Sequence, residues 1–373
     1  MTIAPTSIGH RILRSRALAA LTSPHGVDRY LEQVNPMWAA HEVRARLVTV
    51  HRETDGTHPV ATLSLQPTST WRGHRAGQYV QVGVEIDGAR RTTRCFSISS
   101  AASAPGEPFT ITVRAHDDAR TRRSVSRFLA LEARPGQVLH LAQAQGEFTL
   151  AGSPATPSNE PLLMISGGSG ITPVMSMLRT LLRDGYDGRA NRPVTFLHYA
   201  RRPEDQIFAA ELERIAAADN DVEVHLVHTG AGGTRFSAEA LARLQPGFAG
   251  VDTWVCGPAG LVDGVRAAYD GSPRLRLELF QAPVARSTSA EGNVAFSRSG
   301  LTRPNTGASL LEQAEAAGLT PAHGCRMGIC FSCTSTKTHG TVRNVLTGEE
   351  SSLPDEEIRL CVSAPLGSCA VDL

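Results

Sequence analysis

The sequence predicts a multidomain chain that combines β and α/β folds, and three observations support this prediction. Residues from about 42 to 150 form short runs of branched and aromatic residues between Gly, Pro and Asp turns, which is typical of a small antiparallel β-barrel. From about residue 161, strands alternate with helices, which is typical of a doubly wound parallel α/β sheet. The length of 373 residues leaves room for a third, smaller C-terminal domain.

Composition narrows the class of protein. Hydrophobic content of 41% and charged content of 20% are typical of an ordinary globular protein. Seven cysteines, four of them in one motif, argue against a secreted disulfide framework and for a reducing compartment. A net charge of +1 gives no case for nucleic-acid binding, and no apolar run approaches the roughly 18 residues that span a bilayer. We therefore expect a cytoplasmic protein, or one that is peripheral at the inner face of the membrane.

Residues 1–41 form an N-terminal helical extension. Ile8–Leu21 and Val27–Val34 are the expected helices, separated by a break at Pro24-His-Gly26. Residues 1–46 contain six arginines and three acids, so their net charge is +3. We favour packing of the extension against the next domain over an amphipathic membrane helix, because the apolar residues of the first helix do not share one face.

The barrel is expected at residues 42–153. Its strands are predicted at 43–51, 61–66, 79–86, 96–98, 109–113 and 138–142, with one helix at 124–131.

The α/β domain is expected at residues 158–282. Its strands are predicted at 162–166, 194–199, 222–227, 253–256 and 275–280, and its helices at 173–183, 209–217, 238–242 and 259–268. Residues 283–292 lack apolar periodicity and are expected to form a linker. The last domain covers 293–373, with short strands and a helix at 309–317.

The last domain contains the run Cys325-Arg-Met-Gly-Ile-Cys330-Phe-Ser-Cys333, and Cys361 follows after a long gap. Spacing of four residues and then two, with a distant fourth thiolate, is that of a plant-type [2Fe–2S] cluster. Zinc sites and scattered structural cysteines are the alternatives, but zinc usually prefers paired short spacings and only one C-x2-C is present. Gly324 and Gly328 suit a backbone wrapped tightly around a cluster.

Three further motifs follow one another along the chain. Arg94-Cys-Phe-Ser97-Ile-Ser-Ser100 ends a barrel strand, and Gly167-Gly-Ser-Gly170-Ile-Thr-Pro173 joins a strand to a helix whose N-terminal amides can cradle a pyrophosphate. Cys256-Gly-Pro258 joins a later strand to a helix, although a lone cysteine there is more often a core residue. In this order they resemble the flavin-binding, G-G-x-G-I-T-P and C-G-P motifs of the ferredoxin–NADP reductase superfamily, over roughly residues 42–373. The C-terminal domain then resembles a β-grasp ferredoxin.

The resemblance implies a role for each matching residue. Arg94, Phe96 and Ser97 would bind flavin, and Ser124, Val125 and Ser126 would hold its phosphate, although Arg123 replaces a common glycine and Phe96 a commoner tyrosine. Ser97, Cys256 and Glu278 would border the hydride-transfer site as catalytic residues. The pyridine nucleotide would be bound by Gly167, Gly168, Gly170, Thr172, Arg201, Arg235, Gly257 and Pro258. The cluster ligands would be Cys325, Cys330, Cys333 and Cys361, the last preferred to Cys369 because Arg359-Leu-Cys361-Val matches the family pattern.

The sequence leaves two choices of cofactor, FAD or FMN as the flavin and NADPH or NADH as the pyridine nucleotide. Gly146-Glu-Phe148 resembles the ending of FAD-type relatives, so FAD is favoured over FMN. Arg201 and Arg235 follow the second and third strands of the α/β domain and no acid ends either strand, so NADPH is favoured over NADH. Both arginines are equally compatible with solvated loop positions.

The implied activity is that of an NAD(P)H-dependent flavoprotein iron–sulfur reductase. A nicotinamide gives two electrons as a hydride, a plant-type cluster accepts one, and flavin handles both, so nicotinamide C4 must approach flavin N5 at about 3–3.5 Å. An acidic group at Glu349, Glu350, Asp355, Glu356 and Glu357 is expected to dock a basic partner or to form a solvated loop.

The resemblance implies an oxygen-activating partner protein as the electron acceptor. Residues 23–38 resemble the N-terminus of actinobacterial NADPH oxidoreductases that serve membrane acyl-CoA (stearoyl-CoA) desaturases, which implies a role in fatty acid desaturation. The alternatives are a Rieske oxygenase, a diiron hydroxylase or a P450. A different class of function is that of a non-catalytic redox sensor or regulatory electron-transfer subunit. The intact nucleotide motifs argue against it.

Overall fold

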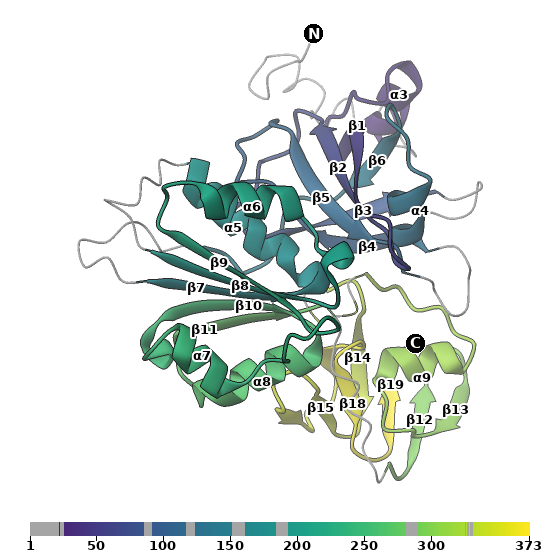
Figure 1. Ribbon diagram of the computed structural model, residues 1–373. Helices are drawn as coiled ribbons and strands as arrows, with labels where there is room; N and C mark the ends of the chain where they lie inside the picture. The colour runs from purple at the N-terminus through teal and green to yellow at the C-terminus, as the bar shows by residue number, and fades with distance from the viewer. Residues whose placement is uncertain are drawn as a thin grey trace. The chain divides into compact units, whose positions relative to one another are not determined.

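The computed structural model describes residues 22, 26–85, 92–116, 124–150, 161–183, 193–280, 290–324, 326, 328 and 331–373. The chain divides into two compact units, Met1–Glu278 and Leu279–Leu373, and each is treated by itself (Figure 1). The helix expected at Ile8–Leu21 lies outside the described residues, and so do Arg123, Cys325 and Cys330.

Six antiparallel strands form the first sheet, in the order β4-β3-β6-β1-β2-β5. An isolated bridge between Ile98 and Ile111 joins the end of β4 to β5, so the two edge strands meet and the sheet closes into the expected barrel. The bounds are β1 Val43–Thr54, β2 Val60–Pro67, β3 Tyr79–Val84, β4 Thr92–Ser97, β5 Phe109–Arg114 and β6 Val138–Leu141.

One boundary in the barrel was predicted wrongly. Strand β4 begins at Thr92, whereas the sequence predicted a strand from Phe96. The residues Thr92 to Cys95 are exposed or half-buried, so this part of the strand lacks the branched and aromatic pattern that marks the others. Arg94 therefore lies within the strand rather than at its end.

The barrel interior is filled by alternate residues of its strands. Leu63 and Leu65 on β2 are fully buried, and Trp71 stacks on Phe109 with ring centroids 4.7 Å apart. Burying such a side chain contributes about 1.5–3 kcal/mol, so this interior is the main stabilising element of the barrel. Helix α4, Val125–Leu131, covers it through Val125 and other buried residues.

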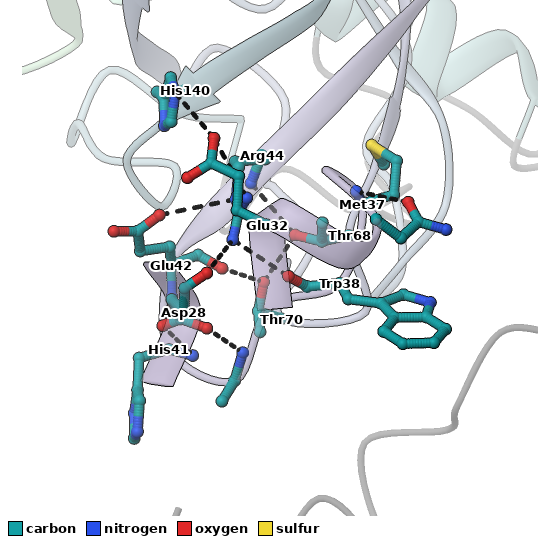
Figure 2. A network of polar contacts seen from close by, with 12 residues as sticks. Asp28, Glu32, Met37, Trp38, His41, Glu42, Arg44, Thr68, Thr70 and His140 are labelled. Atoms are coloured by element: carbon teal, nitrogen blue, oxygen red, sulfur yellow. Dashed lines mark hydrogen bonds and ion pairs between the residues drawn. The ribbon is translucent and has the colours of Figure 1, made fainter. Parts of the chain in front are cut away.

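Helix α3, Val27–Val34, is fixed to the barrel by a network of polar contacts (Figure 2). The Asp28 carboxylate accepts hydrogen bonds from the backbone N–H groups of Ala40, His41 and Glu42. Arg44 on β1 is fully buried and donates to the carbonyl oxygens of Asp28 and Trp38, at 3.4 and 3.0 Å. The prediction that the extension packs against the next domain is thus confirmed for its described part.

Arg44 also ion-pairs with two carboxylates from the same network. Its Nη1 lies 3.4 Å from Oε1 of Glu32 on α3, and its Nε lies 3.5 Å from Oε2 of Glu42. A buried guanidinium is strongly destabilising unless it is paired, so these contacts make α3 a structural part of the barrel.

The second half of unit 1 is a five-stranded sheet in the order β11-β10-β7-β8-β9. Helices α5 and α6 cover one face and α7 and α8 the other, which is the doubly wound arrangement that the sequence predicts (Figure 1). The bounds are β7 Leu162–Gly167, α5 Ile171–Arg183, β8 Val194–Ala200, α6 Ala209–Ala217, β9 Val222–His228, α7 Ala238–Leu244, β10 Asp252–Gly257, α8 Ala259–Tyr269 and β11 Leu275–Leu279. Among the described helices, none combines the length and apolar character needed to cross a lipid bilayer.

Specific hydrogen bonds join the barrel to the α/β sheet within unit 1. Trp254 Nε1 donates to the Thr149 carbonyl oxygen at 3.1 Å, and Arg179 Nη1 donates to that of Ser99 at 2.5 Å. Arg179 also pairs with Glu211 on α6. The Arg179 bond holds the segment after β4 against helix α5, and the Trp254 bond holds the segment after β6 against β10.

Unit 2 contains a mixed five-stranded sheet in the order β13-β12-β19-β14-β17 and a small sheet in the order β16-β15-β18. Its helix α9 packs on the core through Leu310, Leu311 and Ala314, and begins with a capping box between Ser309 and Glu312. This is the β-grasp fold expected. The bounds are β12 Asn293–Phe296, β13 Leu301–Pro304, α9 Leu310–Ala316, β14 Thr334–His339, β15 Val342–Asn344, β16 Glu350–Ser351, β17 Glu356–Arg359, β18 Ser363–Pro365 and β19 Cys369–Val371.

Candidate functional site

The three candidate flavin-binding residues of the first motif lie together on β4. Arg94 and Phe96 are two residues apart, so their side chains project to the same side of the strand. Phe96 is half-buried and rests partly on the barrel core, and Ser97 is buried. Arg94 Nη1 donates to the Thr93 carbonyl oxygen at 2.9 Å. The strand therefore presents a guanidinium and an aromatic ring side by side.

The second group of candidate flavin residues lies at the start of α4. Ser124 is the N-cap, and its hydroxyl accepts the Arg127 N–H at 3.1 Å while it donates to the His116 carbonyl oxygen at 2.5 Å. Val125 is buried and Ser126 is half-buried, with its hydroxyl 3.2 Å from that of Ser124. The Ser124 hydroxyl thus organises the helix start, whose first-turn backbone N–H groups suit a phosphate.

The glycine turn and the Cys-Gly-Pro segment lie at the carboxyl ends of neighbouring parallel strands. The strand order reverses between β7 and β10, and in such sheets ligands bind at this switch point. Gly167–Gly170 follow β7, whereas Gly257 and Pro258 follow β10. The fold therefore brings together two motifs that lie about ninety residues apart in the sequence.

The two segments touch so closely that only glycine fits. A Cβ atom on Gly170 would lie 2.3 Å from the carbonyl oxygen of Cys256, and one on Gly257 would lie 3.0 Å from the Gly167 nitrogen. Gly168 has a φ of +54°, in the left-handed region. Thr172, which is buried in the first turn of α5, donates its hydroxyl to the Ser169 carbonyl oxygen at 3.0 Å.

Cys256 and Glu278 are buried on the adjacent strands β10 and β11. Burial raises the pKa of the Cys256 thiol well above its usual value, and the Glu278 carboxylate shifts the pKa in the same direction. The thiol therefore remains protonated at neutral pH. A protonated thiol is a poor nucleophile, which agrees with an orienting role at a strand end.

The loops after β8 and β9 carry the two candidate arginines. The side chains of Arg201 and Arg235 are exposed. The loops are hydrogen-bonded to each other, because the N–H of Gly230 donates to the Arg201 carbonyl oxygen at 2.7 Å and that of Thr229 to Ala200 at 3.0 Å. Arg201 and Thr229 thus belong to one surface beside the switch point, and this geometry leaves both arginines accessible to an anion.

The structure adds a partly buried polar cluster that the sequence analysis does not single out. Arg114 at the end of β5 projects from the barrel to the glycine turn, with its Nη atoms 3.6 and 3.7 Å from the position that a Gly168 Cβ would take. His198 on β8 is fully buried, and its Nδ1 lies 2.8 Å from the Ser166 hydroxyl. His228 ends β9. The sequence did contain a sign of these three residues, because each is a polar residue in or directly after an apolar run at the carboxyl end of a strand.

This cluster contains buried atoms that none of the described residues satisfies by a hydrogen bond. They are Arg114 Nε, His198 Nε2 and His228 Nε2. Burial and the nearby Arg114 charge lower the pKa of His198 to about 3, so its ring is neutral. Unsatisfied buried polar atoms are rare in native proteins and call for a ligand or water. Of these side chains, Arg114 is the one that lies beside the glycine turn, where its guanidinium can meet an anion such as a phosphate.

The cysteine loop in unit 2 is described at Gly328, Cys333 and Cys361, while Cys325 and Cys330 lie outside the described residues. Cys333 and Cys361 are buried, and the N–H of Gly328 donates to the Cys361 Sγ at 3.2 Å. Gly328 has a φ of +75°, and a Cβ there would lie 2.8 Å from a Val362 methyl carbon. A thiol receiving a backbone N–H in a glycine-dependent cradle fits an iron–sulfur ligand.

Cys369, the alternative fourth ligand, lies on β19 in the sheet rather than in this loop. Burial raises its thiol pKa to about 11. Within the described residues no group of three or more His, Cys, Asp or Glu side chains could hold a metal, as expected when two of the four cysteines fall outside them.

The acidic group of unit 2 is only partly available to a partner. Glu350 pairs with Arg343 at 2.6 Å, and Glu356 lies 3.4 Å from the buried ammonium group of Lys337. Glu349, Asp355 and Glu357 are exposed. Four of the five acidic residues are thus exposed, and one of these four, Glu350, is paired with Arg343.

Comparison with known proteins identifies the nucleotide-binding domain and the cluster-binding domain. Residues 164–267 match the family model of the oxidoreductase NAD-binding domain, and residues 297–366 match that of the 2Fe-2S iron-sulfur cluster binding domain. The chain is 36% identical over 372 residues to the NADPH oxidoreductase of Mycobacterium tuberculosis, which covers 98% of this chain and 93% of the relative. It is 29% identical to the glycine betaine monooxygenase reductase subunit of Pseudomonas aeruginosa, over 90% and 96% of the two chains.

Among solved structures, phthalate dioxygenase reductase is similar with a TM-score of 0.57 and 20% sequence identity. The alignment covers 89% of this chain and 98% of that one, so it supports the same fold over nearly the whole length. Near-complete coverage at 36% identity, together with both domain matches, establishes the family. The chain belongs to the ferredoxin–NADP reductase superfamily and is an NAD(P)H-dependent oxidoreductase that uses flavin and a [2Fe–2S] cluster.

Proposed function

We propose that this enzyme takes electrons from NADPH and passes them, through FAD and the cluster, to an oxygen-activating partner protein. The observation that carries the proposal is the Arg114 guanidinium, whose Nη atoms lie beside Gly168 in the glycine turn. This cation and the N-terminal N–H groups of α5 lie at the same turn, an arrangement that suits the pyrophosphate of a dinucleotide.

Each candidate residue then has a specific task. Arg94 would bind a flavin phosphate, Phe96 would stack on the flavin ring, and Ser97 would donate a hydrogen bond to the ring's edge. Backbone N–H groups at Ser124, Val125 and Ser126 would receive the second phosphate of FAD. When bound, the flavin accepts the two electrons of a hydride and releases them one at a time.

Binding of the nicotinamide would be directed by the two segments at the switch point. Gly167, Gly168, Gly170 and Thr172 would approach the pyrophosphate, and Gly257 and Pro258 would border the nicotinamide. Cys256 and Glu278 would orient the ring and exclude water without accepting a proton. Arg201 and Arg235 would bind the 2′-phosphate, which favours NADPH over NADH because no acid ends β8 or β9.

The domain assignments belong to the same proposal. We assign residues 1–41 to the extension, 42–153 to the flavin barrel, 158–282 to the nucleotide domain, 283–292 to the linker and 293–373 to the ferredoxin domain. The cluster ligands are Cys325, Cys330, Cys333 and Cys361. We place the enzyme in the cytoplasm, at most in peripheral contact with a membrane.

The acceptor that we favour is a membrane acyl-CoA desaturase, on the resemblance of residues 23–38 to the reductases that serve such enzymes. An oxygenase component is the alternative, and the relative from P. aeruginosa, whose name is that of a monooxygenase reductase subunit, supports it. Pull-down from the native cell decides between them: co-purification of a desaturase supports the first, and co-purification of an oxygenase component contradicts it.

Turnover by the isolated protein tests the reductase activity itself. We expect steady NADPH-dependent reduction of both cytochrome c and ferricyanide. Absence of turnover with either acceptor would contradict the proposal and favour a redox sensor.

Removal of one proposed cluster ligand tests the order of electron flow. We expect Cys330→Ser to abolish cytochrome c reduction and to spare ferricyanide reduction, because ferricyanide can take electrons from the flavin directly. Cys369→Ser is the matched control and should leave cytochrome c reduction intact. Equal loss of both activities in Cys330→Ser would contradict the proposed order.

A further inference from the structure

An exposed aromatic side chain lies inside the cysteine loop. Phe331 is 65% exposed, and its φ of +57° is in the left-handed region, where a bulky side chain is a genuine outlier. Its carbonyl oxygen accepts hydrogen bonds from the N–H and the hydroxyl of Thr334, at 3.1 and 2.8 Å. These bonds fix the strained backbone. A conformation of this kind persists only where surrounding contacts determine it.

The ring of Phe331 is held from the other side by Arg359. The guanidinium carbon of Arg359 lies 4.9 Å from the ring centroid, in the geometry of a cation–π contact. Arg359 ends β17 and pairs in register with Thr334 at the start of β14, so the sheet itself places the arginine over the loop. The left-handed turn and the strand register therefore bring the two side chains together.

Arg359 also holds the residue whose N–H contacts a candidate ligand, because it bonds the peptide group that follows the donating N–H of Gly328. Its Nη1 donates to the carbonyl oxygen of Gly328, and the N–H of Gly328 donates to Cys361 Sγ at 3.2 Å. Cys361 is two residues after Arg359, and the N–H of Leu360 donates to the Cys333 carbonyl oxygen at 3.1 Å. One arginine thus connects the exposed ring, the glycine cradle and the turn after β17 that carries Cys361.

We propose that Arg359 is a positioning residue that sets the reduction potential of the cluster by its charge and by holding Gly328 so that its N–H donates to Cys361, and that Phe331 holds the arginine in place. This rests on the proposed ligand role of Cys361. One electron enters the cluster on reduction and no bond forms or breaks, so the ligand sulfurs gain negative charge. A nearby guanidinium and an N–H donor to a sulfur both stabilise the reduced form, which raises the potential.

The first test replaces the charge. We expect Arg359→Gln to lower the midpoint potential of the cluster, measured by a redox titration followed by electron paramagnetic resonance. The expected size is about tenfold in the ratio of reduced to oxidised cluster, which is about 59 mV for a one-electron couple. Arg298→Gln is the matched control: it removes the same charge from the same unit, in a pair with Asp372 that includes no residue of the loop. A potential equal to that of the control would overturn the proposal.

The second test separates the hydrogen bond from the charge. Arg359→Lys keeps the charge but cannot cover the ring and donate with the same planar geometry, so it should lower the potential less than Arg359→Gln. Resonance Raman spectra should show higher Fe–S(Cys) stretching frequencies in Arg359→Gln than in Arg298→Gln, because a weaker N–H donor to the sulfur strengthens the Fe–S bond. Identical frequencies would contradict the route through Gly328.

The third test addresses Phe331, and the single variant Phe331→Leu decides the case if Arg359→Gln does not assemble a cluster. Phe331→Leu keeps a bulky side chain but removes the ring face, so the potential should fall in the same direction by a smaller amount. Phe331→Leu combined with Arg359→Gln should give the potential of Arg359→Gln alone, because the ring acts through the arginine. Additive shifts, or an unchanged potential in Phe331→Leu, would contradict this role. A wild-type protein without a cluster spectrum would instead contradict the proposed function.

Discussion

At the scale of single residues, the unusual feature of this reductase is how many buried polar groups stay neutral. Cys256 is fully buried with a raised pKa, and His198 is fully buried with a lowered one. Both shifts arise chiefly from desolvation, which disfavours the charged form. Because the Cys256 thiol and the His198 ring are neutral, neither offsets the positive charge that Arg114 places beside the glycine turn.

Replacing Cys256 tests its orienting role. We expect Cys256→Ser to slow NADPH-dependent flavin reduction by about tenfold, or about 1.4 kcal/mol in the barrier, because a shorter, more polar side chain leaves the ring less well positioned. Stopped-flow absorbance of the flavin measures this rate. Cys369→Ser, the same exchange in unit 2, is the control. In the wild type no ionisation of this thiol should be seen between about pH 6 and 9, and an alkaline transition that disappears in Cys256→Ser would contradict the neutral thiol.

Arg114 was not a sequence candidate, and its substitution tests the polar cluster. We expect Arg114→Gln to weaken pyridine nucleotide binding by about 10- to 100-fold, since a hydrogen bond to a charged group contributes about 1.5–3 kcal/mol. The flavin content should not change. The exposed Arg134→Gln in the same domain is the control. Titration of the oxidised protein with NADP+ gives the dissociation constant, and equal affinity in both variants would show that the cluster does not contact the nucleotide.

At the scale of elements, α3 is stabilised by its attachment more than by its own length. Eight residues form a marginal helix in isolation, and Gly26 provides no side-chain cap. The Asp28 carboxylate instead binds three consecutive backbone N–H groups that lead into β1. The helix and the strand therefore depend on one side chain.

Removal of that carboxylate should detach the helix. We expect Asp28→Ala to destabilise unit 1 by about 1–3 kcal/mol, because it leaves buried N–H groups unsatisfied. Denaturant unfolding measures the loss, and hydrogen exchange should accelerate at Ala40 to Glu42. Asp55→Ala, at a carboxylate that is 88% exposed, is the control and should change neither quantity. Protected amides in Asp28→Ala would mean that Arg44 holds α3 by itself.

The elements themselves were largely predictable from the sequence. The strands and helices of the α/β domain follow clear apolar periodicity, and the structure reproduces them with boundary changes of about one to two residues. Strand β4 was less predictable because its first half is polar and half-exposed. The contact between Gly170 and Cys256 could not be derived from composition or spacing, since it depends on the order of strands in the sheet. The cluster of Arg114, His198 and His228 was missed for the same reason.

At the scale of the molecule, buried histidines make the stability of unit 1 sensitive to acid. Burial lowers the pKa of His74 to about 4 and that of His198 to about 3. Below about pH 6.5 the unfolded chain binds protons at these positions while the folded chain does not. Stability therefore falls as the pH falls toward the folded-state pKa values.

The expected loss is about 2 kcal/mol for each of the two histidines between pH 7 and 5. Denaturant unfolding at both pH values, monitored by a probe in unit 1, measures it. His74→Asn removes one of the two contributions and should reduce the pH dependence by about half, whereas His58→Asn, at an exposed ring, should leave it unchanged. Full pH dependence in His74→Asn would contradict the lowered pKa of His74.

The contact between Gly170 and the carbonyl oxygen of Cys256 also bears on protein engineering. Because a Cβ at 170 would come within 2.3 Å of that oxygen, the segment after β7 and the segment after β10 constrain each other's sequence. A redesign of nicotinamide binding has to transplant both segments from one donor protein. The side chains of Arg201 and Arg235 are exposed, so their proposed part in coenzyme preference can be tested one residue at a time.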